Sequence, residues 1–181
     1  MSSERKVQAQ KDNHAPIALL VIDVQKGLFK KSTPIYKAEQ LLENINALVR
    51  RAGRAGAPVL YIQHANKMLV EGTDDWELHP EIERLETGVA IHKRHGNAFQ
   101  DTNLREELEA RGIRRLVITG LVTHGCVKAT CIGAKGQGYE VVLVKDGHSS
   151  YSKQAAKLIA EWNEKLSEGT VELRATEEIA F

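Results

Sequence analysis

The sequence predicts an α/β fold, a three-layer α/β/α domain built around a doubly wound, mainly parallel six-stranded sheet. Short apolar runs alternate along the chain with longer segments of helical periodicity. Several of these runs are apolar on both faces, as expected for strands that are buried in a parallel sheet. The recurring order of strand, loop, helix and strand is typical of doubly wound domains.

The apolar runs predict six strands, over residues 17–22, 58–63, 89–92, 115–119, 139–144 and 170–173. Helical periodicity predicts four helices, over residues 38–55, 102–111, 125–135 and 152–166. The second helix has Thr102 as its candidate N-cap, and Gly112 is expected to end it. Residues 65–87 show no clear period, and so long a connection inside a compact domain is often a functional loop.

The composition fits one globular domain, which we assign to residues 16–181, preceded by a flexible polar tail at residues 1–15. With a net charge of +1 and scattered basic residues, the chain lacks the basic surface of nucleic-acid and membrane proteins. The longest strongly apolar stretch, residues 18–22, is too short to cross a bilayer, and the N-terminal residues lack the apolar core of a secretory signal. We therefore expect a cytoplasmic protein with reduced cysteines.

Three reactive side chains stand at the predicted ends of strands. Asp23 follows the first strand, Lys93 follows the third, and Cys126 comes shortly after the fourth. In open parallel sheets, ligands bind beyond the carboxyl ends of the strands. An acid, an ammonium and a thiol are thus expected at one edge of the sheet.

These three groups together can perform acyl transfer. The start of a helix and a nearby ammonium both favour the thiolate, so we expect the pKa of Cys126 to lie well below that of a free thiol. Free backbone N–H groups at this turn can hold an oxyanion, and a carboxylate within reach can carry the thiol proton to the leaving group. The sequence therefore predicts a nucleophilic cysteine.

Each of these residues also has a commonplace interpretation. A carboxylate after a strand is often a turn residue, a lysine at a strand end is often solvated, and a cysteine at a helix start often fills the core. Two rival functions stay open on the residues alone. One is a redox-active thiol at Cys126, and the other is a non-catalytic oligomeric binding protein.

The sequence resembles the isochorismatase-like cysteine hydrolases, a group that includes nicotinamidases and N-carbamoyl-amide hydrolases. Three segments carry the resemblance: ALLVIDVQ at residues 18–25 with Phe29; Lys93 with Asn97-Ala98-Phe99, Thr102 and Leu104; and GLVTHGCV at residues 120–127, followed by GYEV at 138–141 and Asp146. The resemblance implies a Rossmann-like fold, a homo-oligomer and hydrolysis of a carbon–nitrogen bond in a small amide or carbamoyl compound.

The resemblance also assigns site residues. The family's triad maps onto Asp23, Lys93 and Cys126. A non-proline cis peptide is expected between Val122 and Thr123, which would direct the Thr123 N–H, with that of Cys126, at the oxyanion. Candidate substrate-binding residues are Phe29, His64, Trp76 and His124, while Gln25 is expected to brace the loop after the first strand.

Two differences from subgroups of the family narrow the expected activity and the expected cofactors. Isochorismatases proper have a glycine at the nucleophile position, so Cys126 argues against that activity. Nicotinamidases carry an Asp-x-His pair after the second strand, whereas this chain has Gln63, His64 and Ala65 there. One histidine without a carboxylate is a poor site for a divalent ion, so we expect no metal and no other cofactor.

Overall fold

The computed structural model describes residues 16–181, and the predicted tail at residues 1–15 lies outside them. Six strands form one sheet in the order β3-β2-β1-β4-β5-β6, and every neighbouring pair is parallel. The strands are β1 (Ile17–Ile22), β2 (Val59–His64), β3 (Val89–Lys93), β4 (Arg115–Leu121), β5 (Glu140–Ser149) and β6 (Glu172–Arg174). The predicted α/β fold is confirmed, and the strand order reverses direction between β1 and β4.

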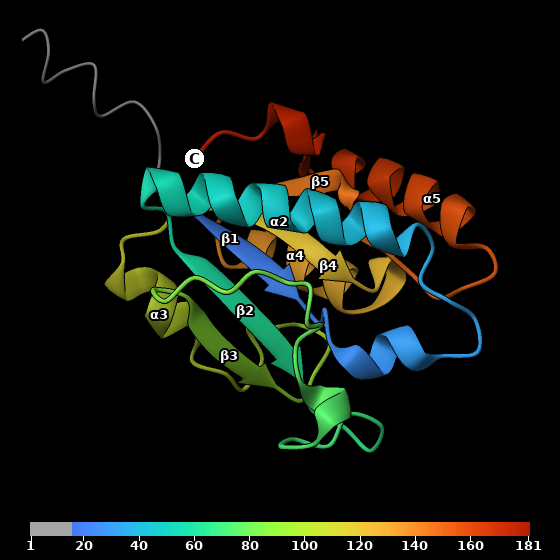
Figure 1. Ribbon diagram of the computed structural model, residues 1–181. Coiled ribbons are helices and arrows are strands. Elements are labelled where there is room, and N and C mark those ends of the chain that lie inside the picture. The colour runs from blue at the N-terminus through green and yellow to red at the C-terminus, as the bar shows by residue number, and fades with distance from the viewer. Residues whose placement is uncertain (1–15) are drawn as a thin grey trace, which may run out of the picture.

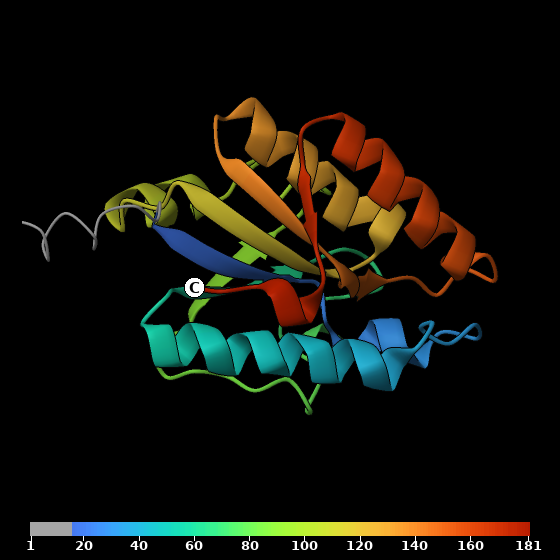
Figure 2. The ribbon, with the colours of Figure 1, turned by 90° about the horizontal axis from the view of Figure 1, so that it is seen from above.

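The helices lie on both faces of the sheet, which gives three layers (Figures 1 and 2). Helix α2 (Ala38–Ala55) covers one face together with the 3-10 turn η4 (Thr176–Glu178). The other face carries α3 (Leu104–Ala110), α4 (Lys128–Gly136) and α5 (Ala155–Glu168). Shorter turns are η1 (Lys26–Lys30), η2 (Asp74–Trp76) and the irregular η3 (Thr123–Val127).

Alternating residues of the central strands form two separate cores. In β1, Leu20 and Ile22 pack toward α3 and α4, whereas Leu19 and Val21 pack toward α2. Successive side chains of a strand point to opposite faces, so a strand covered on both sides must be apolar throughout. This requirement explains why the unbroken apolar run at residues 18–22 predicted β1 correctly.

Strand β1 and helix α2 have their predicted bounds, the other elements differ by one to five residues, and two of these differences bear on the candidate site. Strand β5 continues five residues beyond residue 144, with a shift of register against β4 after Leu143. Helix α4 starts at Lys128, because Gly125 has a non-helical backbone (φ −115°, ψ −112°). Cys126 therefore lies in the irregular turn η3 and not in the first turn of α4.

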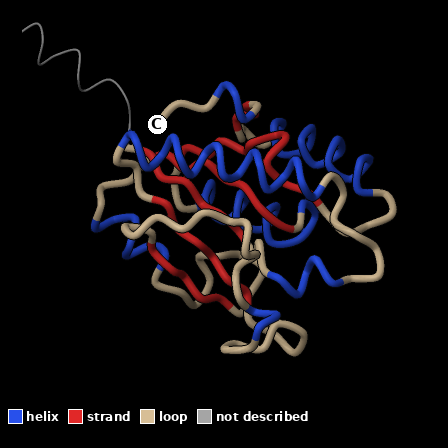
Figure 3. Tube along the Cα trace, in the orientation of Figure 1, coloured by secondary structure: helices blue, strands red, loops and turns tan. Residues whose placement is uncertain are grey.

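The long connection between β2 and β3 contains only one short helical turn, η2 (Figure 3). Side chains hold it against η1: Lys26 pairs with Asp74 at 2.6 Å, and Lys30 pairs with Asp75. A bridge between Gln25 and Leu78 adds a backbone contact. The connection is thus fixed beside the end of β1, although its sequence has no regular period.

Strands β1 and β4 approach each other closely just before the candidate site. Gly120 has a φ of +118°, and a Cβ built on it would lie 2.0 Å from the backbone oxygen of Ile22. Only glycine fits both the backbone conformation and the space.

Among residues 16–181, no helix is long and apolar enough to span a membrane.

Candidate active site

Asp23 directly follows β1 at the point where the strand order reverses. Its side chain is buried (3% exposed for the residue), and its backbone is in the left-handed region at a φ of +52°. Oδ2 accepts a hydrogen bond from Lys93, while Oδ1 has no partner among the described residues. Burial raises the pKa of the Asp23 carboxyl, and the charge of Lys93 only partly opposes this effect.

Lys93, the last residue of β3, brings its ammonium to the centre of the site. Nζ lies 3.0 Å from Asp23 Oδ2, 3.1 Å from Cys126 Sγ and 3.1 Å from the backbone oxygen of His95. A fourth neighbour, His64 Nδ1, is 2.7 Å away. The residue is 1% exposed, so the ammonium obtains from these groups the hydrogen bonds that water would otherwise provide.

Cys126 is half-buried, and its thiol faces the same ammonium. Burial raises the pKa of Cys126 to about 12, the negative charge of Asp23 adds to this effect, and Lys93 opposes it. The prediction of a lowered pKa for Cys126 is therefore wrong, because desolvation outweighs the effect of the Lys93 ammonium. A thiol with so high a pKa is protonated at neutral pH.

The cis peptide lies one bond earlier than expected, between Leu121 and Val122. None of these peptides precedes a proline, so the residue types gave no signal that could separate one bond from the next. The expected reorientation of the Thr123 N–H by a cis bond at Val122–Thr123 is therefore corrected. Instead, the buried Thr123 hydroxyl lies 2.8 Å from His148 Nδ1 and 3.1 Å from the backbone oxygen of Ser149.

Gln25 and His64 form a brace beside the ammonium. The Gln25 side chain accepts from the His64 backbone N–H at 2.9 Å, and donates to the backbone oxygens of His64 at 3.0 Å and Trp76 at 2.8 Å. The expected bracing role of Gln25 is thus confirmed.

Burial and the charge of Lys93 lower the pKa of His64, so the neutral ring accepts at Nδ1 and keeps its proton on Nε2.

A model of the isochorismatase domain matches residues 17–165. The chain belongs to the isochorismatase family of hydrolases. Among curated relatives, a streptothricin hydrolase from Streptomyces noursei is 33% identical over 147 residues, which are 80% of this chain and 53% of that protein. The chain therefore spans about half of that relative's length. Nicotinamidase 3 of Arabidopsis thaliana is 28% identical over 172 residues, 84% of each chain.

A solved isochorismatase family protein superposes with a TM-score of 0.85 at 28% identity, covering 88% of this chain and 98% of the other. The similarity thus extends over the sheet and both helical layers. In the present chain, the acid follows β1, the ammonium ends β3 and the thiol lies in the turn η3 after β4, so the three groups come from segments far apart in sequence.

The other expected residues of this isochorismatase-family chain lie around the loops. Trp76 is buried, packs edge-on against His92 and has an indole Nε1 without a partner in the described chain. Phe29, in η1, lies against His79 with ring centroids 4.4 Å apart. His124 is half-buried, and its Nδ1 likewise has no partner within residues 16–181. Their contact with a substrate stays a proposal.

Three potential metal ligands meet in the site. Asp23, His64 and Cys126 each offer one atom, and these atoms lie within 4.8 Å of one another. Lys93 Nζ, however, lies within hydrogen-bond distance of the same three side chains. A metal ion at the ordinary bond length of about 2.0–2.3 Å from these atoms would clash with the Lys93 ammonium and be repelled by its charge. The donor set therefore suits the ammonium and does not fit a metal ion while Lys93 is in place.

Sequence reasoning missed three groups that shape the site. His95 contributes only a backbone oxygen, which no residue type reveals. Gln63 donates a hydrogen bond to the Trp76 backbone oxygen at 3.1 Å and so links β2 to η2. His148 lies in the last part of β5, which was not predicted as strand because most residues after position 144 are polar.

Proposed function

We propose that the chain is a cysteine hydrolase that cleaves a carbon–nitrogen bond of a small amide or carbamoyl compound through a thioester-type intermediate. The observation that carries the proposal is the position of the Lys93 ammonium, 3.0 Å from Asp23 and 3.1 Å from Cys126 in a buried site. A surface lysine or a core cysteine would not need this arrangement. Cys126 is the nucleophile, Asp23 carries the proton and Lys93 stabilises the negative charges.

In the first step, the Cys126 thiol gives its proton to Asp23, and the sulfur attacks the carbonyl carbon of the substrate. The raised pKa of Asp23 strengthens it as a base for this transfer. Lys93 offsets the charge that forms on the sulfur, because its Nζ already contacts Sγ. The carbonyl electrons move to the oxygen, where the backbone N–H of Cys126 is our proposed donor.

In the second step, the oxyanion collapses and the carbon–nitrogen bond breaks. The leaving amine takes the proton from Asp23 and departs, which leaves the acyl group on Cys126. A water molecule then attacks the thioester and gives a proton to Asp23. The carbon–sulfur bond breaks, the sulfur regains a proton from Asp23, and a carboxylic or carbamic acid is released.

The names of two relatives support this class of reaction. Nicotinamidase 3 acts on an amide by its name, and streptothricin hydrolase names a hydrolytic reaction. Phe29, His64, Trp76 and His124 are our proposed substrate contacts. The neutral His64 presents an Nε2–H that can donate to a substrate oxygen.

The rival functions receive less support. A redox-active thiol would give no task to the buried Asp23 and Lys93 side chains. Cys131, the other thiol, is fully buried and free. A non-catalytic binding protein would have no use for a buried acid, ammonium and thiol in contact.

We also propose a homo-oligomer in the cytoplasm with a small-molecule substrate. Light scattering of the purified chain measures the oligomeric state. A monomer at working concentrations would contradict that expectation.

The proposed activity is tested by incubating the purified protein with nicotinamide, small aliphatic amides, ureido acids and streptothricin. Release of ammonia or amine is the readout, and trapping of an acyl group on Cys126 by mass spectrometry identifies the intermediate. Iodoacetamide should label Cys126 far faster than the fully buried Cys131. Turnover that survives in the Cys126→Ala protein would overturn the covalent mechanism.

A further inference from the structure

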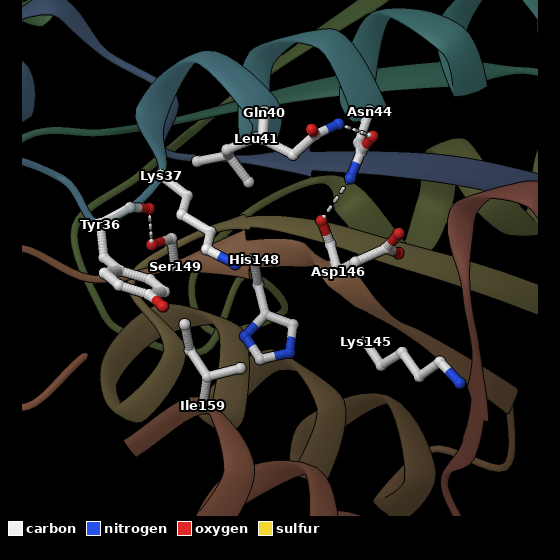
Figure 4. Close-up of a pocket in the computed structure, with 10 residues that line it drawn as sticks. All are labelled: Tyr36, Lys37, Gln40, Leu41, Asn44, Lys145, Asp146, His148, Ser149 and Ile159. Carbon is white, nitrogen blue, oxygen red and sulfur yellow. Dashed lines mark hydrogen bonds between the residues drawn. The ribbon is translucent and has the colours of Figure 1, made fainter. Parts of the chain in front are cut away.

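A cavity lies away from the proposed triad. It has a volume of about 250 Å³ and opens between the start of α2, the end of β5 and α5 (Figure 4). Asp23, Lys93 and Cys126 do not line it. It exists because the register shift after Leu143 lets β5 bulge, so that Lys145, Asp146 and His148 reach the rim.

The walls of this cavity combine positive charge with apolar surface. Lys37 and Lys145 form no ion pair within residues 16–181, and Figure 4 shows the Lys37 side chain extending across the cavity toward His148. The one carboxylate, Asp146, uses Oδ1 to accept from the N–H and the hydroxyl of Thr176, at 2.8 and 2.9 Å. Leu41 and Ile159 supply the apolar wall.

The cavity is connected to the nucleophile turn by hydrogen bonds. His148 contacts Thr123, the first residue of η3, at 2.8 Å, and its Nε2 lies 2.9 Å from Asn163 Oδ1 on α5. The Ser149 backbone oxygen accepts from the same Thr123 hydroxyl. Its own hydroxyl donates to the backbone oxygen of Tyr36 at 2.6 Å. Residues that line the cavity thus hold the turn that carries Cys126.

We propose that this cavity is an effector site for a small organic carboxylate, with the carboxylate on the Lys37 ammonium and the carbon skeleton against Ile159 and Leu41. Two ammonium groups against one engaged carboxylate leave the rim positive, which favours a monoanion over a neutral molecule of the same shape. A ligand that displaces His148 or Ser149 changes the support of Thr123, and so the exposure of the Cys126 thiol. Hydrolysis of an amide releases a carboxylate, so the effector would share the chemical class of a product; that connection rests on the proposed function.

The binding test uses benzoate as the probe and benzamide as its neutral counterpart, with isothermal titration calorimetry of the full chain. We expect benzoate to bind at least about tenfold more tightly than benzamide, a difference of about one ion pair. Lys37→Met should weaken benzoate about tenfold and Lys37→Glu should abolish its binding. The matched control, Lys135→Met on α4, should bind as the wild type does. Equal binding of the two probes, or unchanged binding by Lys37→Glu, would overturn the site.

The connection to the turn is tested separately, by the rate at which iodoacetamide alkylates Cys126. Saturating benzoate should change this rate at least about twofold in the wild type and leave it unchanged in Lys37→Glu. An effect that persists in Lys37→Glu would place the benzoate in the active site instead. Benzoate bound through Lys37 with an unchanged rate would overturn the connection. Neither measurement depends on turnover, so the proposed hydrolase function can fail without affecting them.

Discussion

Lys93 is the residue on which the site depends most, because one buried ammonium neutralises an acid and contacts a thiol. Its replacement by methionine keeps most of the stem and removes the charge. The pKa of Cys126 should then rise further, because Lys93 is the group that lowers it. We expect turnover to fall by at least about a hundredfold, in the range of a lost electrostatic stabiliser.

The measurement for Lys93→Met is kcat/KM together with the rate of alkylation of Cys126 against pH. The alkylation profile should move to higher pH. Lys67→Met, an exposed lysine of the long connection, is the matched control and should leave both quantities unchanged. An alkylation profile identical to that of the wild type would mean that Lys93 does not influence the thiol.

Cys126→Ala should separate chemistry from stability. The substitution removes the proposed nucleophile but only one half-buried sulfur, so we expect turnover to vanish and the free energy of unfolding to fall by about 1 kcal/mol. Urea unfolding and amide hydrolysis are the two measurements. A large loss of stability would show that the sulfur is mainly a core atom.

At the residue scale the sequence predicted which side chains meet better than it predicted their surroundings. The meeting of Asp23, Lys93 and Cys126 was predicted because each stands shortly after the predicted end of a strand in a parallel sheet. The pKa of Cys126 was predicted with the wrong sign, since residue order does not report how much water a group loses. The hydroxyl bond from Thr123 was missed because its partner, His148, is 25 residues away.

The close approach of β1 and β4 is the element-level feature that positions Asp23. Gly120→Ala places a Cβ against the backbone of Ile22, the residue before Asp23, at a φ that alanine rarely adopts. We expect a loss of unfolding free energy of about 3 kcal/mol or more, or failure to fold. The control is Gly136→Ala at the end of α4, where nothing lies within 4 Å and the change should stay within about 1 kcal/mol. Equal urea midpoints for the two variants would contradict this account.

Among the elements, prediction succeeded where side-chain pattern decides and failed where backbone geometry decides. Strand β1 and helix α2 have the predicted bounds. Burial on both faces makes β1 an unbroken apolar run, and burial of one face gives α2 a clear helical period. The last five residues of β5 are four polar residues and a glycine, and only the final two pair with β4. The connection from β2 to β3 is fixed by ion pairs, which leave no periodic trace.

At the scale of the whole molecule, the site is expected to work without a metal. Lys93 stands among the three potential ligands, so activity should survive exhaustive treatment with EDTA or phenanthroline. Replacing Lys93 with alanine removes the competing cation and should allow Co²⁺ to bind the Cys126 sulfur, detected as a thiolate-to-cobalt absorption band. Loss of wild-type activity on chelation, restored by Zn²⁺, would show that a metal takes part.

The acid stability of the fold should depend on His148, which joins α5 to the turn η3. Burial lowers its pKa to about 4, against about 6.5 in the unfolded chain. Above pH 6.5 the ring is neutral in both states and has no effect on the pH dependence. As the pH falls from about 6.5 to about 4, His148 takes up a proton in the unfolded chain but not in the folded chain. The free energy of unfolding therefore falls by about 3 kcal/mol over this range.

His148→Gln replaces the ring with an amide that does not titrate, while His92→Gln changes an exposed ring on β3 and serves as the control. Urea unfolding at about pH 7 and about pH 4.5 gives the loss of stability for each protein. The other titrating groups contribute similarly to all three, so the difference between losses isolates His148. We expect the loss to be about 2–3 kcal/mol smaller in His148→Gln than in the wild type and in His92→Gln. Equal losses in all three proteins would mean that His148 accepts a proton in the folded state. The contacts by which His148 joins Thr123 to α5 would then be looser than the distances describe.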